Sequence, residues 1–596
     1  MVFLDKKNEM LEKMIEVGHS RFDPEYGMLT RVVKAAKGAY HTNYTGRIHH
    51  TRDSAEHINK VCYMKKSEYY SDVRAILKRL PEFQDVREGS PTYGLWGYVC
   101  EEPIEDMLAP DYNNADFTGK HIAYVLKYCP EALDEESMAA AKLALTRAAQ
   151  CSINRNVSAD YTNICFMSLN TIIGAGELCD RPDMFEKGKE RLKTAYRYHK
   201  HNGAFSEFNS PTYSPLVVEE LSRLLLLTDD AEIKKMSEEL IYMAWEEILI
   251  RYDADRRELC PPMMRAYRSS TTGMVEELLF AGTKGEFGSV DYFMKLGEYE
   301  PLFVPELLSL DNVVCPEELV EKYLRNKPQN PRFIEKTFYK KNDIRSEGED
   351  TVIVRNLNSP DLKCFGYMTD DYMMGAFEKT DMWVQRRSSM VTWGAGDTFG
   401  AVRIRCFNFD YDYCSGMVYT NQLDNVMLSH TGFATDRGDF HYILDNVIKG
   451  RGIKSELTTK KLFYAFCLEG TAQNAKVERN GDNFVIDNGE IKVYINIYKA
   501  VFGGEDMEIV YNEEEKQIEL ICFDEEKTVD FAKMDKATYI VFTMSVNEEA
   551  DEPETSEENG FVTSEIAVHG KKLTLTSATT PKLFDEIMEN TNSTRE

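Results

Sequence analysis

The sequence lacks a long apolar segment. A helix that crosses a bilayer needs about 20 consecutive, predominantly apolar residues, and the apolar run LLLL at 224–227 is bounded by charged residues. Residues 1–20 are charged and amphipathic, without the apolar core and small-residue cleavage site of a secretory signal. These absences predict a protein without a membrane span, and we expect a cytoplasmic location.

Positive charge is also scarce. The chain has 71 Lys and Arg residues against 100 Asp and Glu residues, which gives a formal net charge of −29. A surface this acidic repels DNA, RNA and anionic membranes, so nucleic-acid and membrane partners are not expected. A local basic pocket for a small anionic substrate is compatible with this net charge, and so is a homo-oligomer.

Paired cysteines and common cofactor motifs are missing. The 13 cysteines are an odd number and form no Cys-x-x-Cys pair, a pattern typical of free thiols in a reducing compartment. The glycine-rich dinucleotide fingerprint, the Walker phosphate loop and the His-Glu-x-x-His zinc motif do not occur. The sequence therefore predicts an activity that requires no cofactor.

What the sequence does contain is two regions with different hydrophobic periods. Apolar residues recur at helical spacing up to about residue 325, most clearly in 137–153, 215–227 and 231–250. We predict a helical domain over 1–328 and an antiparallel β-sandwich domain over 335–596. Many helix pairs in one domain favour an (α/α) toroid, whose central cavity suits an oligosaccharide.

The second region consists of short runs that predict strands. They lie at 351–357, 382–393, 401–409, 484–500, 517–523, 537–546 and 564–578. A His-Gly pair inside the last run predicts a hairpin turn, and the acidic segment 547–560 is expected to be a solvated loop. Strands in series, without intervening helices, favour an antiparallel sandwich over βαβ units.

The stretch 92–119 combines aromatic rings with carboxylates and amides. Such groups suit sugars, because an aromatic face covers C–H groups while polar atoms take the hydroxyls. The candidate substrate-binding residues here are Trp96, Glu102, Asp111, Asn113 and Asp116. The alternative is a polar loop between helices whose acids cap the next helix.

The stretch GAFSEFNSPTYSPL (203–216) holds Glu207, Asn209 and Tyr213 just before a predicted helix. Glu and Tyr can transfer protons when their pKa values are tuned, whereas simple turn and capping chemistry is the alternative. Asn163, in 159–177, opens another predicted helix, and an asparagine in that position is by itself typical of a helix cap.

Two further stretches supply candidates. CPPMMRAYRSS (260–270) offers Arg265 and Tyr267 as a cation and a phenol for a cavity rim, and Gln385 in 382–393 is a candidate substrate-binding residue. Five candidates lie at or near predicted helix ends, which ring the opening of a toroid. We expect these five to converge on one cavity: Asn163, Glu207, Tyr213, Arg265 and Tyr267.

The segment GAFSEFNSPTY, with its Gly, Glu, Asn and Tyr, resembles a segment of heparinase II/III-like polysaccharide lyases. The 50-residue separation of Asn163 and Tyr213 is similar to the spacing in that family. The resemblance implies a toroid followed by a β-sandwich, and a catalytic centre made of Asn163, Tyr213 and a histidine from the β-domain. It also allows a structural divalent metal in the β-domain, although no dedicated ligand cluster is visible there.

The family's His-x-His-x-Asp-like loop is absent from this sequence, so the third catalytic residue has to be sought elsewhere. His430 is the preferred candidate because it follows the Tyr/Asn/Gln-rich run 417–425, and His441 is the second candidate. Each is also compatible with a purely structural histidine.

For a lyase, the chemistry is a β-elimination at a uronic acid. Asn163 and Arg265 would neutralise the carboxylate, and Tyr213 would act as base, as acid, or as both. His430 would take the proton if Tyr213 only donates. Glu207 would orient the substrate or the tyrosine.

Two alternatives stay open at this point. A glycoside hydrolase on the same toroid would use two carboxylates, and the pairs to consider are Glu207 with Asp116 and Glu102 with Asp111. A non-catalytic glycan-binding protein would have Tyr213 and Glu207 fully hydrogen-bonded inside the helical core.

Overall fold

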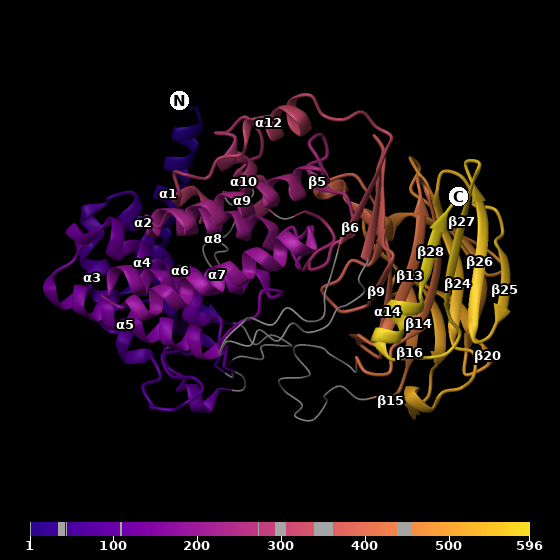
Figure 1. Ribbon diagram of the computed structural model, residues 1–596, viewed down its shortest axis with the longest axis horizontal. Helices are drawn as coiled ribbons and strands as arrows, with labels where there is room; N and C mark the ends of the chain where they lie inside the picture. Colours follow the sequence, from indigo (N-terminus) through magenta and orange to yellow (C-terminus); the bar gives the residue numbers. More distant parts are fainter. Residues whose placement is uncertain are drawn as a thin grey trace.

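The computed structural model describes residues 2–33, 42, 44–107, 110–271, 273–291, 306–338, 362–437 and 455–596. A helical region precedes an antiparallel β region (Figure 1), which confirms the fold class predicted from the sequence. The expected strand at 351–357 and the candidate His441 lie outside the described residues. None of the described helices is long and apolar enough to cross a membrane.

The helices form an inner and an outer layer, as in an (α/α) toroid. The inner helices are α2 (Thr51–Tyr63), α4 (Asn114–Tyr128), α6 (Thr162–Leu178), α8 (Tyr213–Leu227) and α10 (Gly273–Gly282), and each contacts the next one. The outer helices are α1 (Val2–Ser20), α3 (Tyr70–Arg79), α5 (Glu135–Arg155), α7 (Pro182–Asn202), α9 (Ala231–Leu249) and the short α12 (Glu317–Val320). The 3₁₀ turn η5 (Leu307–Ser309) contacts α1, α2 and α10, so it joins the two ends of the inner row.

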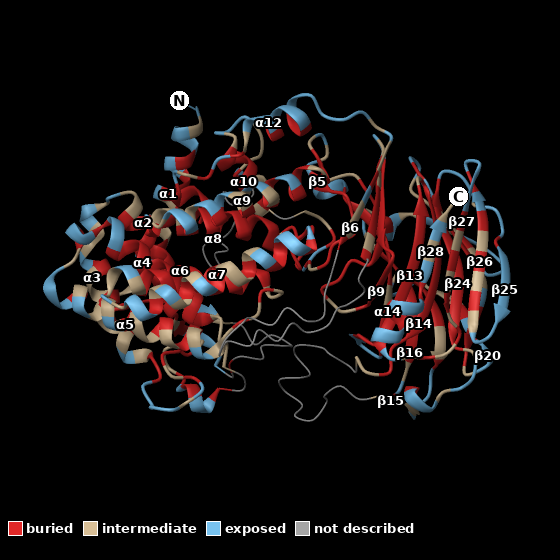
Figure 2. Cartoon of the chain, viewed as in Figure 1, coloured by how far each residue is buried: buried red, intermediate tan, exposed pale blue. Residues whose placement is uncertain are grey.

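The two layers differ in their sequences as their positions require. The first 14 residues of α6 are all buried, because neighbours surround an inner helix on every side. By contrast, α7 keeps an exposed face between its buried residues (Figure 2). The start of α5 is fixed by a capping box in which Asp134 and Ser137 bond reciprocally.

The helical region is not purely helical, contrary to the expectation from the sequence. Strands β1 (Phe22–Asp23), β2 (Met28–Val33) and β3 (Gly46–His49) form a small sheet, and β4 (Tyr252–Asp253) pairs with β5 (Glu258–Leu259). The turn after β1 explains the first hairpin: Asp23 accepts the backbone N–H groups of Glu25 and Tyr26, and Gly27 has a φ of +78°.

The β region has three stacked antiparallel sheets, one more than a simple two-sheet sandwich (Figure 1). The first contains β6 (Arg332–Phe338), β7 (Leu362–Met368), β8 (Tyr372–Phe377), β10 (Ser389–Trp393), β11 (Gly400–Asn408), β12 (Tyr411–Asp412), β16 (Leu462–Gly470), β21 (Glu508–Asn512) and β22 (Gln517–Phe523). The second contains β9 (Lys379–Asp381), β13 (Gly416–Leu423), β14 (Val426–Phe433), β17 (Lys476–Asn480), β18 (Asn483–Asp487), β19 (Lys492–Phe502), β20 (Glu505–Asp506) and β24 (Tyr539–Val546). The third contains β25 (Glu554–Glu558), β26 (Phe561–Val568), β27 (Lys571–Ala578) and β28 (Asn592–Arg595). A separate pair, β15 (Glu456–Thr459) with β23 (Lys527–Asp530), and helix α14 (Phe584–Asn590) complete the region.

Two details of the third sheet bear on the sequence predictions. The His-Gly pair does form the hairpin turn between β26 and β27, with His569 and Gly570 both at positive φ. The acidic segment 547–560, however, is only partly a loop, because β25 pairs with β26 as an edge strand. All five residues of β25 are exposed, and such charged edges discourage pairing with other chains.

The helical and β regions meet through the segment that contains Arg265. Met263 exchanges two backbone hydrogen bonds with Arg387, of 3.1 and 2.9 Å, and Ala266 donates to the carbonyl of Gln385. On its other side, Met264 donates to the carbonyl of Phe208. This segment therefore lies between the loop that precedes α8 and the loop that joins β9 to β10.

Candidate active site

The N-terminal ends of four inner helices lie side by side. Asn114, at the start of α4, donates to Thr51 at the start of α2, and Asn113 contacts the hydroxyl of Tyr161, which precedes α6. Arg265 lies over the rings of both Tyr161 and Tyr213, the latter at the start of α8. Each helix N-terminus carries about half a positive charge, so this rim favours a negatively charged ligand.

Asn163 and Arg265 hold the carboxylate of Glu207 between them. The Asn163 amide Nδ2 lies 2.6 and 2.8 Å from the two Glu207 oxygens, and its backbone N–H donates to Oε2 at 2.8 Å. The Arg265 guanidinium forms an ion pair with Glu207 Oε1. Glu207 is 6% exposed, so its charge is compensated by these donors and not by water.

Arg265 connects this carboxylate to a pair of tyrosines. Its guanidinium lies 4.3 Å from the centre of the Tyr213 ring, and the Tyr213 and Tyr267 hydroxyl oxygens are 2.5 Å apart. Burial raises the pKa of Tyr213 well above 10, although the nearby Arg265 charge opposes this shift. Tyr213 is 9% exposed and Tyr267 is 53% exposed, so the pair leads from the buried cluster to the surface.

The β region contributes to the same cluster. Gln385, in the loop between β9 and β10, accepts a hydrogen bond of 2.7 Å from Arg265 Nε. The ring of Trp383 lies 5.7 Å from the Arg265 guanidinium. The structure thus brings together six residues that the sequence singled out: Asn163, Glu207, Tyr213, Arg265, Tyr267 and Gln385.

Asn209 was predicted to bind substrate, but the structure gives its amide another role. Its Nδ2 donates to the backbone carbonyls of Cys260 and Pro262, at 2.7 and 2.8 Å, and the side chain is 1% exposed. The residue adopts a left-handed conformation, with φ of +51°. Asn209 therefore fixes the chain just before Arg265 and is not presented to a ligand.

Three other candidates lie inside the helical core. Trp96 is fully buried and donates to the carbonyl of Leu80, so its ring is not available to stack on a sugar. Asp116 is also fully buried and accepts a hydrogen bond from Ser152; burial raises its pKa to about 6. Glu102 is 4% exposed. These placements remove the support for the two carboxylate pairs considered for a hydrolase.

Asn113 and Asp111 lie closer to the rim. Asp111 accepts the backbone N–H of Asn113, and the Asn113 side chain bonds to Arg155 at 2.7 Å and to Tyr161 at 3.4 Å. Sequence reasoning missed Tyr161, Arg155 and Trp383. The one available signal was Tyr161, which stands two residues before Asn163 at the predicted helix start.

His430 does not join the cluster. It lies on β14, fully buried, and its two ring nitrogens are 2.8 and 2.9 Å from the hydroxyls of Ser577 and Ser564 on the third sheet. Burial lowers the pKa of His430 to about 3, so the ring is neutral at physiological pH. The histidine expected to complete the catalytic centre is thus a structural residue between two sheets.

A second polar cluster is enclosed by the inner helices. Its ionisable members are Glu56, Lys60, Lys120, His121, Glu219, Glu220, Arg223, Glu277 and Glu306, all less than 10% exposed. Lys120 Nζ lies 3.2, 2.6 and 2.6 Å from carboxylate oxygens of Glu219, Glu220 and Glu306. Since Lys120 is six residues beyond Asn114, this cluster lies roughly 9 Å below the rim.

Burial has opposite effects on two members of this cluster. It lowers the pKa of His121 to about 3, so the imidazole is neutral, and it raises the pKa of Glu219 to about 8 against the influence of Lys120. Within the part of the chain that the structure describes, the groups suited to a metal ion lie here: Glu56, His121 and Glu306, and separately Glu219, Glu220 and Glu306. The structural metal that the resemblance allows in the β region has no such group among the described residues.

A family model described as a domain of unknown function (DUF8769) matches residues 8–277. A heparinase III structure is similar at 10% identity and a TM-score of 0.42, covering 89% of this chain and 82% of that chain. A mutant of the heparan sulfate lyase HepC from Pedobacter heparinus is similar at 10% identity and a TM-score of 0.32, covering 97% and 95%. No curated protein matches the sequence.

The names of these structures coincide with the family that the sequence motifs resemble.

Proposed function

We propose that this chain is a polysaccharide or oligosaccharide lyase that cleaves a uronic-acid-containing glycan by β-elimination. The observation that carries the proposal is the position of Arg265, which touches Glu207, Tyr213 and Gln385 at once. A partly buried cation beside a phenol is what an elimination next to a carboxylate requires, because negative charge develops on the carboxylate as the C5 proton leaves.

Arg265 is the donor for the substrate carboxylate in this proposal. Its Nε and Nη1 are committed to Gln385 and Glu207, while Nη2 has no hydrogen-bond partner among the described residues. The Asn163 side chain donates to Glu207 in this structure. It can therefore bind the substrate only after one of its hydrogen bonds to Glu207 breaks. Glu207 acts as a positioning residue that fixes both donors.

The proton transfers are assigned to the two tyrosines. Tyr213, as a phenolate, takes the C5 proton; the C4–O bond then breaks and the same proton passes to the leaving oxygen, which leaves a C4–C5 double bond. To become a phenolate, Tyr213 first loses its hydroxyl proton, which passes through the Tyr267 hydroxyl to water. The 2.5 Å contact between the two hydroxyls and the exposure of Tyr267 support this route. Arg265 stabilises the phenolate at the moment it forms.

The competing interpretation as a glycan-binding protein would have both Tyr213 and Glu207 sealed in the core. Glu207 meets that description. Tyr213 is also buried and hydrogen-bonded, but its hydroxyl partner is the half-exposed Tyr267, which gives that hydroxyl a route to solvent. This difference favours proton transfer over a purely structural role.

The test is an assay of the full-length chain on a panel of uronic-acid oligosaccharides. A lyase produces an unsaturated sugar that absorbs in the near-ultraviolet, and we expect that absorbance to rise with time on at least one substrate. Cleavage that yields only saturated products would replace the proposal with a hydrolase. Binding without any cleavage across the panel would overturn it in favour of a glycan-binding protein.

A further inference from the structure

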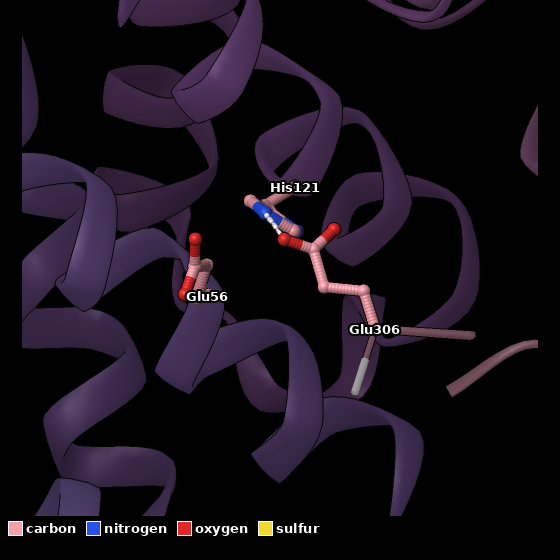
Figure 3. A group of neighbouring side chains, drawn as sticks. All are labelled: Glu56, His121 and Glu306. Atoms are coloured by element: carbon pink, nitrogen blue, oxygen red, sulfur yellow. Dashed lines mark ion pairs between the residues drawn. The ribbon is translucent and has the colours of Figure 1, made fainter. Parts of the chain in front are cut away.

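The enclosed cluster contains two neighbouring cation seats that share Glu306. One seat, formed by Glu219, Glu220 and Glu306, holds the ammonium group of Lys120. The other is formed by Glu56, His121 and Glu306, whose ligand atoms lie within 4.8 Å of one another. Figure 3 shows the His121 ring directed at the Glu306 carboxylate, with Glu56 beside them.

His121 is the observation that points to a ligand in the second seat. The residue is fully buried, and neither ring nitrogen has a hydrogen-bond partner among the described residues. Its Nε2 is 3.6 Å from Glu306 Oε1, which is too long for a hydrogen bond. That distance is close to the roughly 3.4 Å that separates two ligands of a tetrahedral zinc ion with bonds of about 2.05 Å.

The carboxylates around this seat are already oriented by other side chains. Glu306 Oε2 lies 2.6 Å from Lys120 Nζ and 3.2 Å from Arg223 Nη2. The other oxygen, Oε1, faces His121. Glu56 Oε1 accepts a hydrogen bond of 2.9 Å from Arg52. Outer partners that fix a ligand in this way are typical of protein metal sites.

Unlike the first seat, the second seat is not filled by a side-chain ammonium group among the described residues. Lys60 lies near the second seat, but its ammonium donates to the backbone carbonyl of Glu56, not to the carboxylates.

We propose that Glu56, His121 and Glu306 bind a divalent transition-metal cation of the zinc type. One imidazole and two carboxylates are a ligand set that suits such an ion, with a fourth position for water. The ligands come from α2, from α4 and from the residue just before η5, the turn that joins α10 to α1 and α2. The ion would therefore clip the last part of the helical region onto the first, and its role is structural and independent of the proposed lyase activity.

The experiment measures zinc content and thermal unfolding of the full-length chain. The protein is incubated with Zn²⁺, dialysed against metal-free buffer and analysed by elemental mass spectrometry. About one zinc per chain is expected, and chelation should lower the unfolding midpoint by at least about 2 °C. Wild-type protein that retains no zinc would overturn the proposal and leave a pure ion-pair network.

Matched variants locate the ion. His121→Gln should reduce retained zinc at least tenfold, whereas His199→Gln, at another fully buried histidine of the helical region, should leave it unchanged. Glu56→Gln gives an independent test of the same seat if His121→Gln does not fold, as judged by circular dichroism. Equal zinc retention in His121→Gln, Glu56→Gln and His199→Gln would place the metal elsewhere and refute the assignment.

Discussion

The guanidinium of Arg265 lies 4.3 Å from the centre of the Tyr213 ring and forms an ion pair with Glu207 on another edge. A cation placed between a carboxylate and a phenol affects both groups at once. It compensates the buried charge of Glu207, and it opposes the burial that raises the pKa of Tyr213.

Tyr213→Phe should reduce turnover at least about 100-fold, the usual scale for a positioned proton transfer. The substitution keeps the ring, so the unfolding midpoint should change little. Tyr464→Phe is the control, because Tyr464 is a buried tyrosine whose hydroxyl donates to a backbone carbonyl in the β region. Near-ultraviolet product formation measures both variants. A near-normal rate for Tyr213→Phe would remove this residue from the reaction.

Glu207→Gln should lower the free energy of unfolding by about 3 kcal/mol, because it leaves the partly buried Arg265 without its charged partner. Part of the proposed lyase activity should survive, since in the proposed mechanism Glu207 positions the donors and transfers no proton. The control is Glu519→Gln, which breaks the ion pair of a buried carboxylate with Lys461 in the β region and should leave turnover intact. Complete loss of activity in a folded Glu207→Gln protein would favour the hydrolase alternative.

Asn209 should act on catalysis only through the position of Arg265. Asn209→Ala removes the hydrogen bonds to Cys260 and Pro262 and also strains the backbone at a φ of +51°, whereas Asn209→Gly removes the bonds alone. Urea unfolding should therefore show Ala to be less stable than Gly by about 1 kcal/mol. Both variants should lower kcat with little change in the pH profile. An altered pH optimum would instead indicate direct contact with the substrate.

The buried His430 should make the free energy of unfolding depend on pH. Its pKa is lowered to about 3 in the folded protein, so the unfolded chain binds a proton near pH 6.5 that the folded chain does not bind. Its contribution is fully present above pH 6.5 and is lost as the pH falls toward 3, at about 1.4 kcal/mol per pH unit. Urea unfolding at pH 7 and pH 5 should show a smaller loss for His430→Asn than for wild type. His201→Asn, at an exposed histidine, should match wild type.

The helices and strands with a clear hydrophobic period could be predicted from the sequence, and so could the site residues that lie close together in it. Glu207 and Tyr213 are six positions apart at a helix start, so one stretch of sequence revealed both. The role of Asn209 could not be predicted, because its left-handed backbone and its hydrogen bonds to Cys260 and Pro262 depend on a chain segment some 50 residues away. The edge strand β25 of the third sheet was missed because all five of its residues are polar and exposed, as they would be in a loop.

The enclosed cluster also could not be predicted from the sequence. His121 and Glu56 lie on different inner helices, and Glu306 follows the last of them. Each residue alone looks like an ordinary helical side chain. Only the closure of the ring through η5 brings these three together.

Because the row of inner helices closes through η5, the unit that has to fold is longer than the segment that the family model matches. The match ends at residue 277, whereas Glu306 and η5 come later in the chain. A recombinant fragment cut at 277 would keep Lys120 and Arg223 but lose the carboxylate that both of them contact. Expression boundaries for the helical half should therefore extend through Arg325, where its last helical segment ends.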